Sequence, residues 1–302
     1  MDRRPWRLVL ASLAFAAVAP PSLLGLPLAG LILAARPRAP AQWATALLVG
    51  VSSAALLVAG GHDLVTGVLR AYVVLVSAAF VVLSVVAPAR FLRQALRASA
   101  LALAGVAGLA RAILGPKAGG LFQWDATREA SATLRTLIET RPEAYAVFEP
   151  VVRFLGETMP AMLVLQALAG LALAWQWHQR LGPRPLGEPL APFREFRFAD
   201  AWVWGMVGAI AVWITPLFAG LRTAALNVLV VLIAFYLLRG AAIAVAFAGV
   251  AGLSPAVLVG SLVISAALAL PLLFILPGLA TLGVSDTWLE FRRRLVRRPN
   301  VS

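Results

Sequence analysis

The sequence predicts an all-α fold: a polytopic transmembrane helical bundle of roughly 8 to 10 membrane segments. Composition is the first observation, because 61% of the 302 residues are hydrophobic, only 13% are charged and the mean hydropathy is +0.89, far from a soluble domain. The second is that long apolar runs alternate with short polar stretches. The third is that the basic residues, almost all arginine, lie between these runs. Despite a net charge of +13, this placement indicates membrane topology rather than binding of nucleic acid.

Nine apolar segments are candidates for the membrane. The first two are short and meet at Pro20 and Pro21, where a helix cannot continue because proline lacks the N–H donor. They form either a tight pair of short spans or one broken span. Residues 1–21 also have the outline of a secretory signal, and an uncleaved first span is the preferred interpretation. The last segment contains Pro271 and Pro277 and has the same ambiguity. The segments are residues 8–19, 22–35, 41–60, 64–87, 98–115, 158–179, 200–217, 223–249 and 255–284.

Clusters of arginine orient these segments. If the first two segments each cross, every cluster before the seventh segment falls on one side, which the positive-inside rule assigns to the cytoplasm. Residues 60–63 and 116–157 then lie outside. Single passes for the last three segments would put the basic tail outside too, whereas a proline-broken hairpin at 255–284 returns it to the cytoplasm. The clusters are Arg3, Arg4 and Arg7; Arg36 and Arg38; Arg90, Arg93 and Arg97; and Arg180, Arg184, Arg194 and Arg197.

The chain is expected to have three parts. Residues 1–180 form a six-segment membrane unit, residues 181–199 a cytoplasmic basic and aromatic loop, and residues 200–302 the C-terminal membrane segments with the basic tail. Within the external stretch 116–157, helical periodicity before and after Pro142 predicts two amphipathic helices. These helices either connect spans or form a lid over a cavity.

Small residues recur at every fourth position in three of the segments. Such rows let helix backbones approach closely in a membrane, so the segments are expected to pack as a compact bundle. The rows are Ala100, Ala104 and Gly108; Ala201, Gly205 and Ala209; and Gly240, Ala244 and Ala248.

The residues offer no catalytic constellation, so the sequence predicts a protein that is not an enzyme and has no cofactor and no metal site. The absence of cysteine excludes thiolate chemistry, and no phosphate-binding loop is present. His62 and His178 fall on opposite faces of the membrane, and interfacial anchoring is expected for His178. Asp286 is expected to be a solvated residue or a helix cap.

Polar residues inside the spans are the candidate ligand site, because burying an ionisable group in lipid is costly. Asp63 and Arg70 are spaced to bracket an external entrance, although Arg70 could instead extend toward the interface. Gln166 lies within the sixth segment, and Asn227 is expected to form a hydrogen bond between helices. Arg239 lies far from the helix ends but near the inner face.

Two stretches combine aromatic and basic residues. In "PFREFRF", residues 192–198, the phenylalanines are expected to enter the acyl boundary while the arginines meet anionic headgroups. The alternative is that this loop docks a cytoplasmic or membrane partner. The tail has Trp288 and Phe291 beside three arginines, so the two stretches are expected to form one belt, with Asp286 capping a tail helix.

Four blocks carry a resemblance: "QWHQRLG", "PLAPFREFRF" leading into "WVW", "LNVLVVLIAFYLLRG" and "LGVSDTWLEFRRR". They resemble the signature blocks of the YybS-like family of bacterial membrane proteins, over residues 160–295. Arg239 departs from the neutral polar residue of that family. The matching residues are Gln176, Trp177, Arg180, Pro192, Phe193, Arg194, Arg197, Gly240, Asp286, Trp288, Phe291 and Arg292.

That family is similar, more distantly, to the substrate-binding S-components of energy-coupling-factor transporters and to the cell-shape membrane protein MreD. The resemblance implies binding or transport of a small solute, with a partner supplying energy, or else a non-catalytic scaffold of an envelope complex. A cavity lined by polar groups from several helices would favour the first, and a filled core with an outer groove the second. An intramembrane enzyme is the least supported reading. The expected partners are the lipid bilayer, a small molecule and a membrane or cytoplasmic protein, not nucleic acid.

Overall fold

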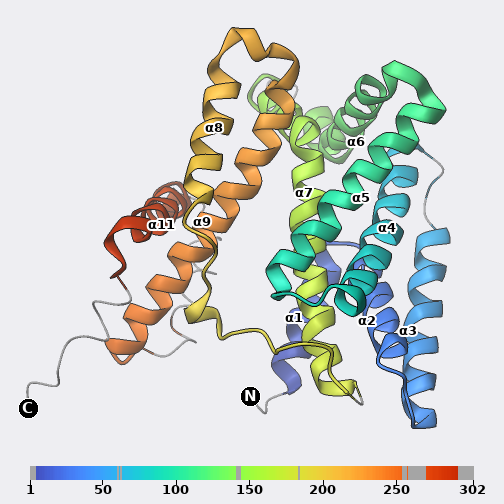
Figure 1. The fold of residues 1–302 in the computed structure, drawn as a ribbon. Helices are drawn as coiled ribbons and strands as arrows, with labels where there is room; N and C mark the ends of the chain where they lie inside the picture. The colour runs from blue at the N-terminus through green and yellow to red at the C-terminus, as the bar shows by residue number, and fades with distance from the viewer. Residues whose placement is uncertain are drawn as a thin grey trace, which may run out of the picture. The chain divides into compact units, whose positions relative to one another are not determined.

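The computed structural model describes residues 5–59, 61, 63–140, 144–182, 184–253, 257 and 270–291. Every described element is a helix (Figure 1), which confirms the predicted all-α fold. The chain divides into two compact units, Met1–Leu190 and Ala191–Ser302. The boundary falls within the loop that follows the sixth predicted segment.

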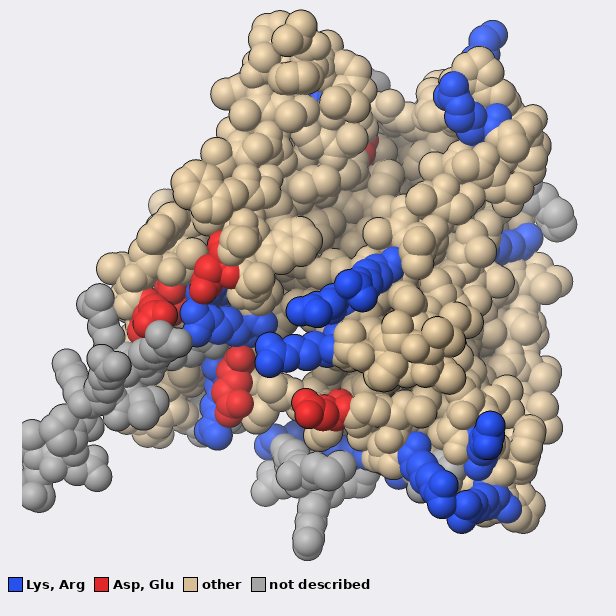
Figure 2. All heavy atoms as spheres, in the orientation of Figure 1, with Lys and Arg blue, Asp and Glu red and all other residues tan. Residues whose placement is uncertain are grey.

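Five of the described helical stretches are long and apolar enough to cross a membrane, and shorter apolar helices accompany them. A polytopic membrane bundle is therefore confirmed. The five stretches are Pro40–Val58, Leu64–Val86, Phe91–Ala132, Phe148–Leu181 and Pro216–Val250. In Figure 2 the visible surface over α8 is almost free of charged side chains, as expected of an apolar membrane helix.

In unit 1, helices α1, α2, α4, α5 and α6 all pack against the longest helix, α7. The elements of this unit are α1 (Pro5–Val18), α2 (Ser22–Ala34), α3 (Pro40–Val58), α4 (Leu64–Val86), α5 (Phe91–Leu114), the 3-10 turn η1 (Gly115–Lys117), α6 (Ala118–Thr140) and α7 (Ala144–Leu181).

The first two helices both pack against α7 and run in opposite directions along it. The Trp177 indole N–H donates to Ser12 Oγ at 2.9 Å, so the middle of α1 lies near the end of α7. Gly170 packs directly on the backbone of Leu23 at the start of α2, while Ile32, at the other end of α2, packs near Trp177. Because α2 returns along the half of α7 that α1 contacts, the two helices are a pair and not one broken span.

The ends of α4, α5 and α7 that carry arginine clusters lie together. The ring of Phe80, near the end of α4, is 5.8 Å from the rings of both Phe91, at the start of α5, and Trp175, near the end of α7. Figure 2 shows further basic side chains at the end of unit 1 where α3 begins. The clusters around Arg36, Arg93 and Arg180 therefore share one end of the unit, as expected from the positive-inside rule.

At the opposite end, α5 turns into α6. Gly115 has a φ of 71° in this turn, a conformation that glycine adopts without steric cost. The Val65 N–H donates to Asp125 Oδ2 at 3.3 Å, which places α6 at the end where α4 begins. This is the end predicted to be external.

The prediction of a second, separate amphipathic helix after Pro142 is wrong, because these residues form the first part of α7. That helix has 38 residues and includes Pro150 and Pro160. At about 1.5 Å per residue it is roughly 57 Å long, whereas a hydrocarbon core measures about 30 Å. The apolar run after residue 157 carries the helix through Pro160, since proline is tolerated where neighbouring helices pack around it. The N-terminal part of α7 therefore extends beyond the membrane alongside α6.

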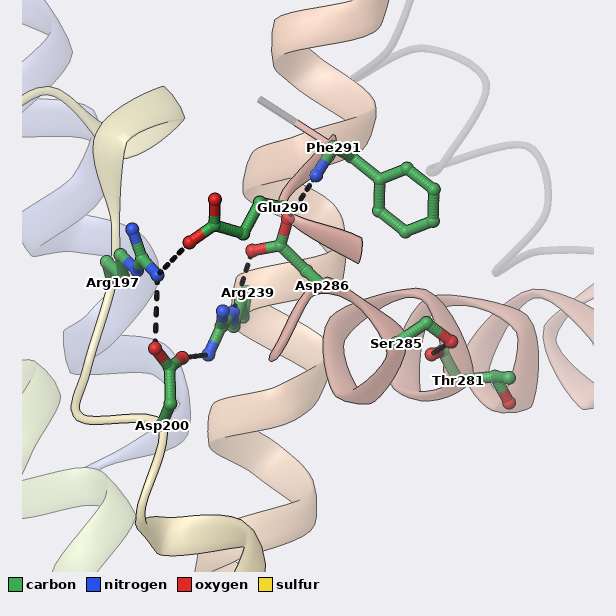
Figure 3. Close-up of polar contacts among 8 residues, drawn as sticks. All are labelled: Arg197, Asp200, Arg239, Thr281, Ser285, Asp286, Glu290 and Phe291. Atoms are coloured by element: carbon green, nitrogen blue, oxygen red, sulfur yellow. Dashed lines mark hydrogen bonds and ion pairs between the residues drawn. The ribbon is translucent and has the colours of Figure 1, made fainter. Parts of the chain in front are cut away.

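Unit 2 is built on a helical hairpin and a helix that crosses it. Its elements are the 3-10 turn η2 (Phe193–Glu195), α8 (Trp202–Ile214), the 3-10 helix η3 (Pro216–Leu221), α9 (Arg222–Val250) and α11 (Leu270–Leu289). Helix α8 packs on α9, and α11 also packs on α9, crossing it steeply in the view of Figure 3.

Two glycines make this crossing possible. A Cβ on Gly240 would collide with the backbone of Leu279, and a Cβ on Gly283 would collide with the backbone of Tyr236. The small-residue row that begins at Gly240 thus lies at a close helix contact, as predicted. The row that begins at Ala100 instead lies on an exposed face of α5.

The C-terminal predictions are only partly within the described residues. Helix α11 ends at Leu289. Residues 258–269, which would hold the turn of the predicted hairpin, and the tail from Arg292 onward lie outside the described residues.

Candidate functional site

A buried arginine with two carboxylate partners is the main polar feature of unit 2. The side chain of Arg239, in α9, is 0% exposed. Its Nε donates to Asp286 Oδ2 at 2.9 Å and its Nη1 donates to Asp200 Oδ1 at 2.7 Å (Figure 3). An arginine charge among apolar helices is costly unless it is paired and hydrogen-bonded. The two carboxylates supply both conditions.

Asp286 holds the inner part of this arrangement. It lies within α11 and its side chain is 3% exposed, so the expectation of a solvated residue or a cap of a tail helix is wrong. The reason is the close crossing at Gly283, which brings this turn of α11 against α9. The second carboxylate oxygen of Asp286 accepts the backbone N–H of Phe291 at 3.0 Å. One side chain therefore neutralises Arg239 and fixes the chain after α11.

Asp200 connects the buried arginine to the surface. Its side chain is 41% exposed, and its second oxygen accepts from Arg197 at 3.1 Å. Arg197 also lies 3.9 Å from Glu290. Partial burial raises the pKa of Asp200, but the hydrogen bond from Arg239 and the charges of Arg239 and Arg197 outweigh burial, so the pKa lies below its ordinary value. The charges thus alternate in sign from α11 to the loop before α8.

Phe198 covers the buried guanidinium. Its ring lies 5.6 Å from Arg239 Cζ and packs edge-on against Tyr236, with ring centroids 5.0 Å apart. Phe198 is buried, so the prediction that all three phenylalanines of residues 192–198 enter lipid is wrong for this one. The ring therefore shields the Arg239 guanidinium, while Asp200 stays partly exposed. Within the described part of the chain, Arg239 Nη2 has no hydrogen-bond partner.

A polar pocket lies between α6 and the N-terminal part of α7. Its volume is about 500 Å³, and both helices line it. Gln123 and Thr127 come from α6, and Glu149, Arg153 and Glu157 come from α7. Arg153 Nη2 and Glu149 Oε1 are 3.2 Å apart with both side chains well exposed. The pocket therefore offers charged groups of both signs to solvent at the predicted external end.

A second, apolar groove of about 680 Å³ runs between α2, α3 and α4. Arg70 is the one charged residue among those described as lining it, and its Nη2 donates to the Val58 carbonyl at the end of α3 at 3.3 Å. Asp63 caps α4, because its carboxylate accepts the Thr66 N–H at 2.9 Å. The hydrogen bonds from Thr66 and the nearby charge of Arg70 lower the pKa of Asp63.

The remaining predicted polar residues lie apart from these features. The Gln166 side chain donates to the Val18 carbonyl at 3.5 Å, which links α7 to the end of α1. Asn227 donates to the Thr223 carbonyl within its own helix at 2.8 Å. His178 is buried, with Nε2 accepting the Leu186 N–H at 3.1 Å, so it fixes the loop after α7 and is not an interfacial anchor. His62 lies outside the described residues.

The residues singled out by the sequence blocks are dispersed. Trp177 links α7 to α1 and Gly240 lies at the α9 and α11 crossing. Pro192 precedes η2, and the ring of Phe193 stacks near that of Phe196 with centroids 6.4 Å apart. Arg292 lies outside the described residues. The exposed members are Gln176, Arg180, Pro192, Phe193, Arg194, Arg197 and Trp288.

Asp200 is the functional candidate that sequence reasoning missed. The chain has only 13 acidic residues, and Asp200 stands directly before an apolar segment. An intramembrane arginine requires a partner, so a search for acids near the ends of neighbouring segments would have indicated both Asp200 and Asp286. Among the described residues, no group of three or more histidine or acidic side chains could hold a metal ion.

Comparison with known proteins identifies one relationship. A family model described as "Predicted membrane protein (DUF2232)" matches residues 126–287, a stretch that includes Asp200, Arg239 and Asp286. No curated protein and no solved structure matches the chain. Because the match covers more than half of the sequence, the chain belongs to the DUF2232 family of membrane proteins.

Proposed function

We propose that the protein binds a small polar solute at the predicted external end of unit 1. The observation that carries this proposal is the pocket between α6 and α7, which is lined by polar groups from two helices. The pocket lies away from the end that holds the arginine clusters. Solute binding on the outer side of a membrane bundle is the first step of uptake.

The lining groups indicate the chemistry of the solute. Glu149 and Glu157 carry negative charges and Arg153 a positive charge, while Thr127 and Ser131 supply hydroxyl oxygens. The hydroxyl protons of both residues donate to carbonyls one turn back in α6, so their oxygens are available as acceptors. This set suits a solute with an amine or several hydroxyl groups in addition to an acceptor.

The proposal extends to transport of the solute, with a partner protein that supplies the energy. The sequence resemblance to YybS-like proteins, and more distantly to S-components, supports a unit that captures the solute while a partner supplies energy. The absence of a nucleotide-binding loop in the sequence is consistent with such a partner.

Mass spectrometry of the purified protein tests the solute. The chain would be purified in mild detergent and its small molecules compared between the parent, Glu157→Gln and Glu188→Gln. Glu188 is an exposed glutamate in the loop after α7, so it controls for loss of a surface charge. The proposal expects a molecule retained by the parent and the control but depleted at least about fivefold in Glu157→Gln, as for loss of one charge-assisted hydrogen bond. Equal retention in all three proteins would refute the pocket.

The orientation is part of the proposal. The loops at 88–97 and 180–199 face the cytoplasm, because the arginine clusters meet at one end of unit 1 and basic loops remain inside. Reporter fusions after Arg97 and Gly187 test this in a bacterial host. Active alkaline phosphatase at either position would show that the loop is external. The topology would then be the reverse of the proposed one, and the pocket between α6 and α7 would face the cytoplasm.

A scaffold is the second candidate function. It is favoured by the exposed row Ala100, Ala104 and Gly108 on α5, where another helix could approach closely. A photocrosslinker placed at Ala104, compared with one at exposed Leu101, tests it. Crosslinking to a specific membrane protein at Ala104 alone would support the scaffold.

A further inference from the structure

The apolar groove of unit 1 is separate from the solute pocket and has its one described charged residue, Arg70, at one end. Its walls are Leu26 from α2, Leu57 from α3, and a row along α4 that includes Val74 and Val82. Both α3 and α4 are long and apolar enough to cross a membrane. The groove therefore lies at the depth of lipid chains and not in water.

The length of the groove matches one leaflet. Its lining along α4 extends from Arg70 to Val82, which is about 18 Å at the rise of an α-helix. One leaflet of a hydrocarbon core is about 15 Å thick. Arg70 follows the start of α4 at Leu64 by six residues, about 9 Å, so the guanidinium lies toward one membrane surface and Val82 deeper.

Few polar groups interrupt the groove. Ser77 lines it, but its hydroxyl donates to the Val73 carbonyl in the same helix at 2.7 Å. Gly30, on α2, faces Val81 so closely that a Cβ would lie 2.8 Å from Val81 Cγ2. The floor is thus apolar and tightly packed, which suits an alkyl chain and not a polar solute.

Arg70 supplies the charge at the end of this groove. The hydrogen bond that Arg70 Nη2 donates to the Val58 carbonyl holds the guanidinium at the mouth of the groove. Guanidinium groups bind phosphate oxygens through charge-assisted, often bidentate hydrogen bonds. Asp63, the N-cap residue of α4, lies seven residues before Arg70 and reduces the positive potential there. Its carboxylate accepts hydrogen bonds from the backbone N–H and the hydroxyl of Thr66.

We propose that this groove is a binding site for an anionic phospholipid, with one acyl chain between α2, α3 and α4 and the headgroup phosphate at Arg70. The argument rests on charge complementarity and on the match between groove length and leaflet thickness. It is independent of the solute pocket, which lies between other helices. The lipid would fill the space between α3 and α4 that no described side chain occupies.

Native mass spectrometry of the full chain in nanodiscs tests the proposal. Nanodiscs of phosphatidylcholine with and without phosphatidylglycerol would be compared for the parent, Arg70→Gln and Arg222→Gln. Arg222 is a matched control, because its guanidinium also donates to a helix-end carbonyl, that of Trp213 at 2.9 Å. The parent and the control should retain phosphatidylglycerol, and Arg70→Gln should retain it about tenfold less.

Two further variants separate the chain from the headgroup. Ala78→Phe or Ala54→Phe would fill the groove, since both alanines line it and are exposed. Either folded variant should lose the bound lipid while keeping Arg70. Asp63→Asn should strengthen retention, because it removes a nearby negative charge.

The outcomes that overturn the proposal are distinct. Equal retention by the parent and Arg70→Gln would exclude Arg70 as the phosphate ligand, and equal retention by a folded groove-filling variant would exclude the groove. If glycerol phosphate in solution displaced the lipid completely at millimolar concentration, a free phosphate compound would be the ligand. Loss of the solute in Glu157→Gln with unchanged lipid would leave this proposal standing.

Discussion

Arg70 and Arg239 are both arginines within long apolar helices, yet their surroundings differ in every respect. Arg70 is half-buried, lies at the mouth of a groove and donates to a carbonyl at the end of α3. Arg239 is fully buried and donates to two carboxylates beneath an aromatic ring. An arginine in a membrane protein can thus either present its charge to the membrane or have it neutralised inside the protein. The comparison predicts that the first arginine governs binding and the second governs folding.

Replacing each arginine by a neutral residue should give the largest difference in stability between the two sites. Arg239→Gln leaves Asp286 buried without its charged partner, so we expect a loss of about 3–5 kcal/mol of stability. Arg70→Gln should change stability by less than about 1 kcal/mol, because its bond is partly exposed. Thermal unfolding in one detergent, followed by circular dichroism, measures both.

A double replacement provides the control for Arg239. Arg239→Met with Asp286→Leu removes both charges and keeps apolar volume, so it should recover most of the stability lost in Arg239→Gln. Failure to recover would mean that the ion pair contributes more than mutual neutralisation.

The crossing beside Arg239 gives the next largest effect. Gly283→Ala places a methyl group against the backbone of Tyr236, and the resulting overpacking should cost about 1–3 kcal/mol. Gly278, on the same helix, has no described atom within 4 Å of its would-be Cβ. Gly278→Ala should therefore be neutral or slightly stabilising. A similar loss in both variants would show that helix flexibility, and not the close crossing, is responsible.

Acid should weaken the outer half of the Arg239 cluster. Because the folded-state pKa of Asp200 is lowered, its contribution to stability is present above the unfolded pKa of about 3.9 and is lost as the pH falls through the folded value. The difference in unfolding midpoint between the parent and Asp200→Asn should be constant above about pH 5 and shrink below about pH 4. We expect no more than about 1 kcal/mol at neutral pH, since the side chain is partly exposed. A difference that grows on acidification would contradict the assignment.

The smallest effect is expected at the rim of the cluster. Arg197 pairs with Asp200 and Glu290 at partly exposed positions, so Arg197→Gln should change stability by less than about 0.5 kcal/mol. Denaturant unfolding of the two proteins at low and high salt measures it. A loss as large as that of Arg239→Gln would mean that the whole chain of charges acts as one unit.

The sequence predicted the helical membrane fold and the shared end of the arginine clusters, because hydropathy and charge placement act locally along the chain. It predicted Gly240 as a close contact for the same reason, from spacing within one helix. The sequence could indicate Asp286 only as one candidate partner of Arg239, because 47 positions separate the two residues and their contact depends on how α11 crosses α9. The hydrophobic pattern also predicted that one helix ends and another begins near residue 157, whereas α7 continues through this position. A change in polarity along a helix need not end the helix.

The continuity of α7 has a mechanical consequence. A single helix of 38 residues runs from the polar pocket to the end where Trp175 and His178 hold the loop before unit 2. An α-helix resists bending over such a length except at defects, and here the defects are Pro150 and Pro160. If α6 closes on the proposed solute, α7 would therefore either bend near those prolines or tilt as a rigid rod whose far end lies among the arginines. Spin labels at the exposed positions Val151 and Gln176 leave the pocket residues unchanged and lie about 38 Å apart along an unbent helix. Bending at Pro160 shortens that separation, and tilting preserves it.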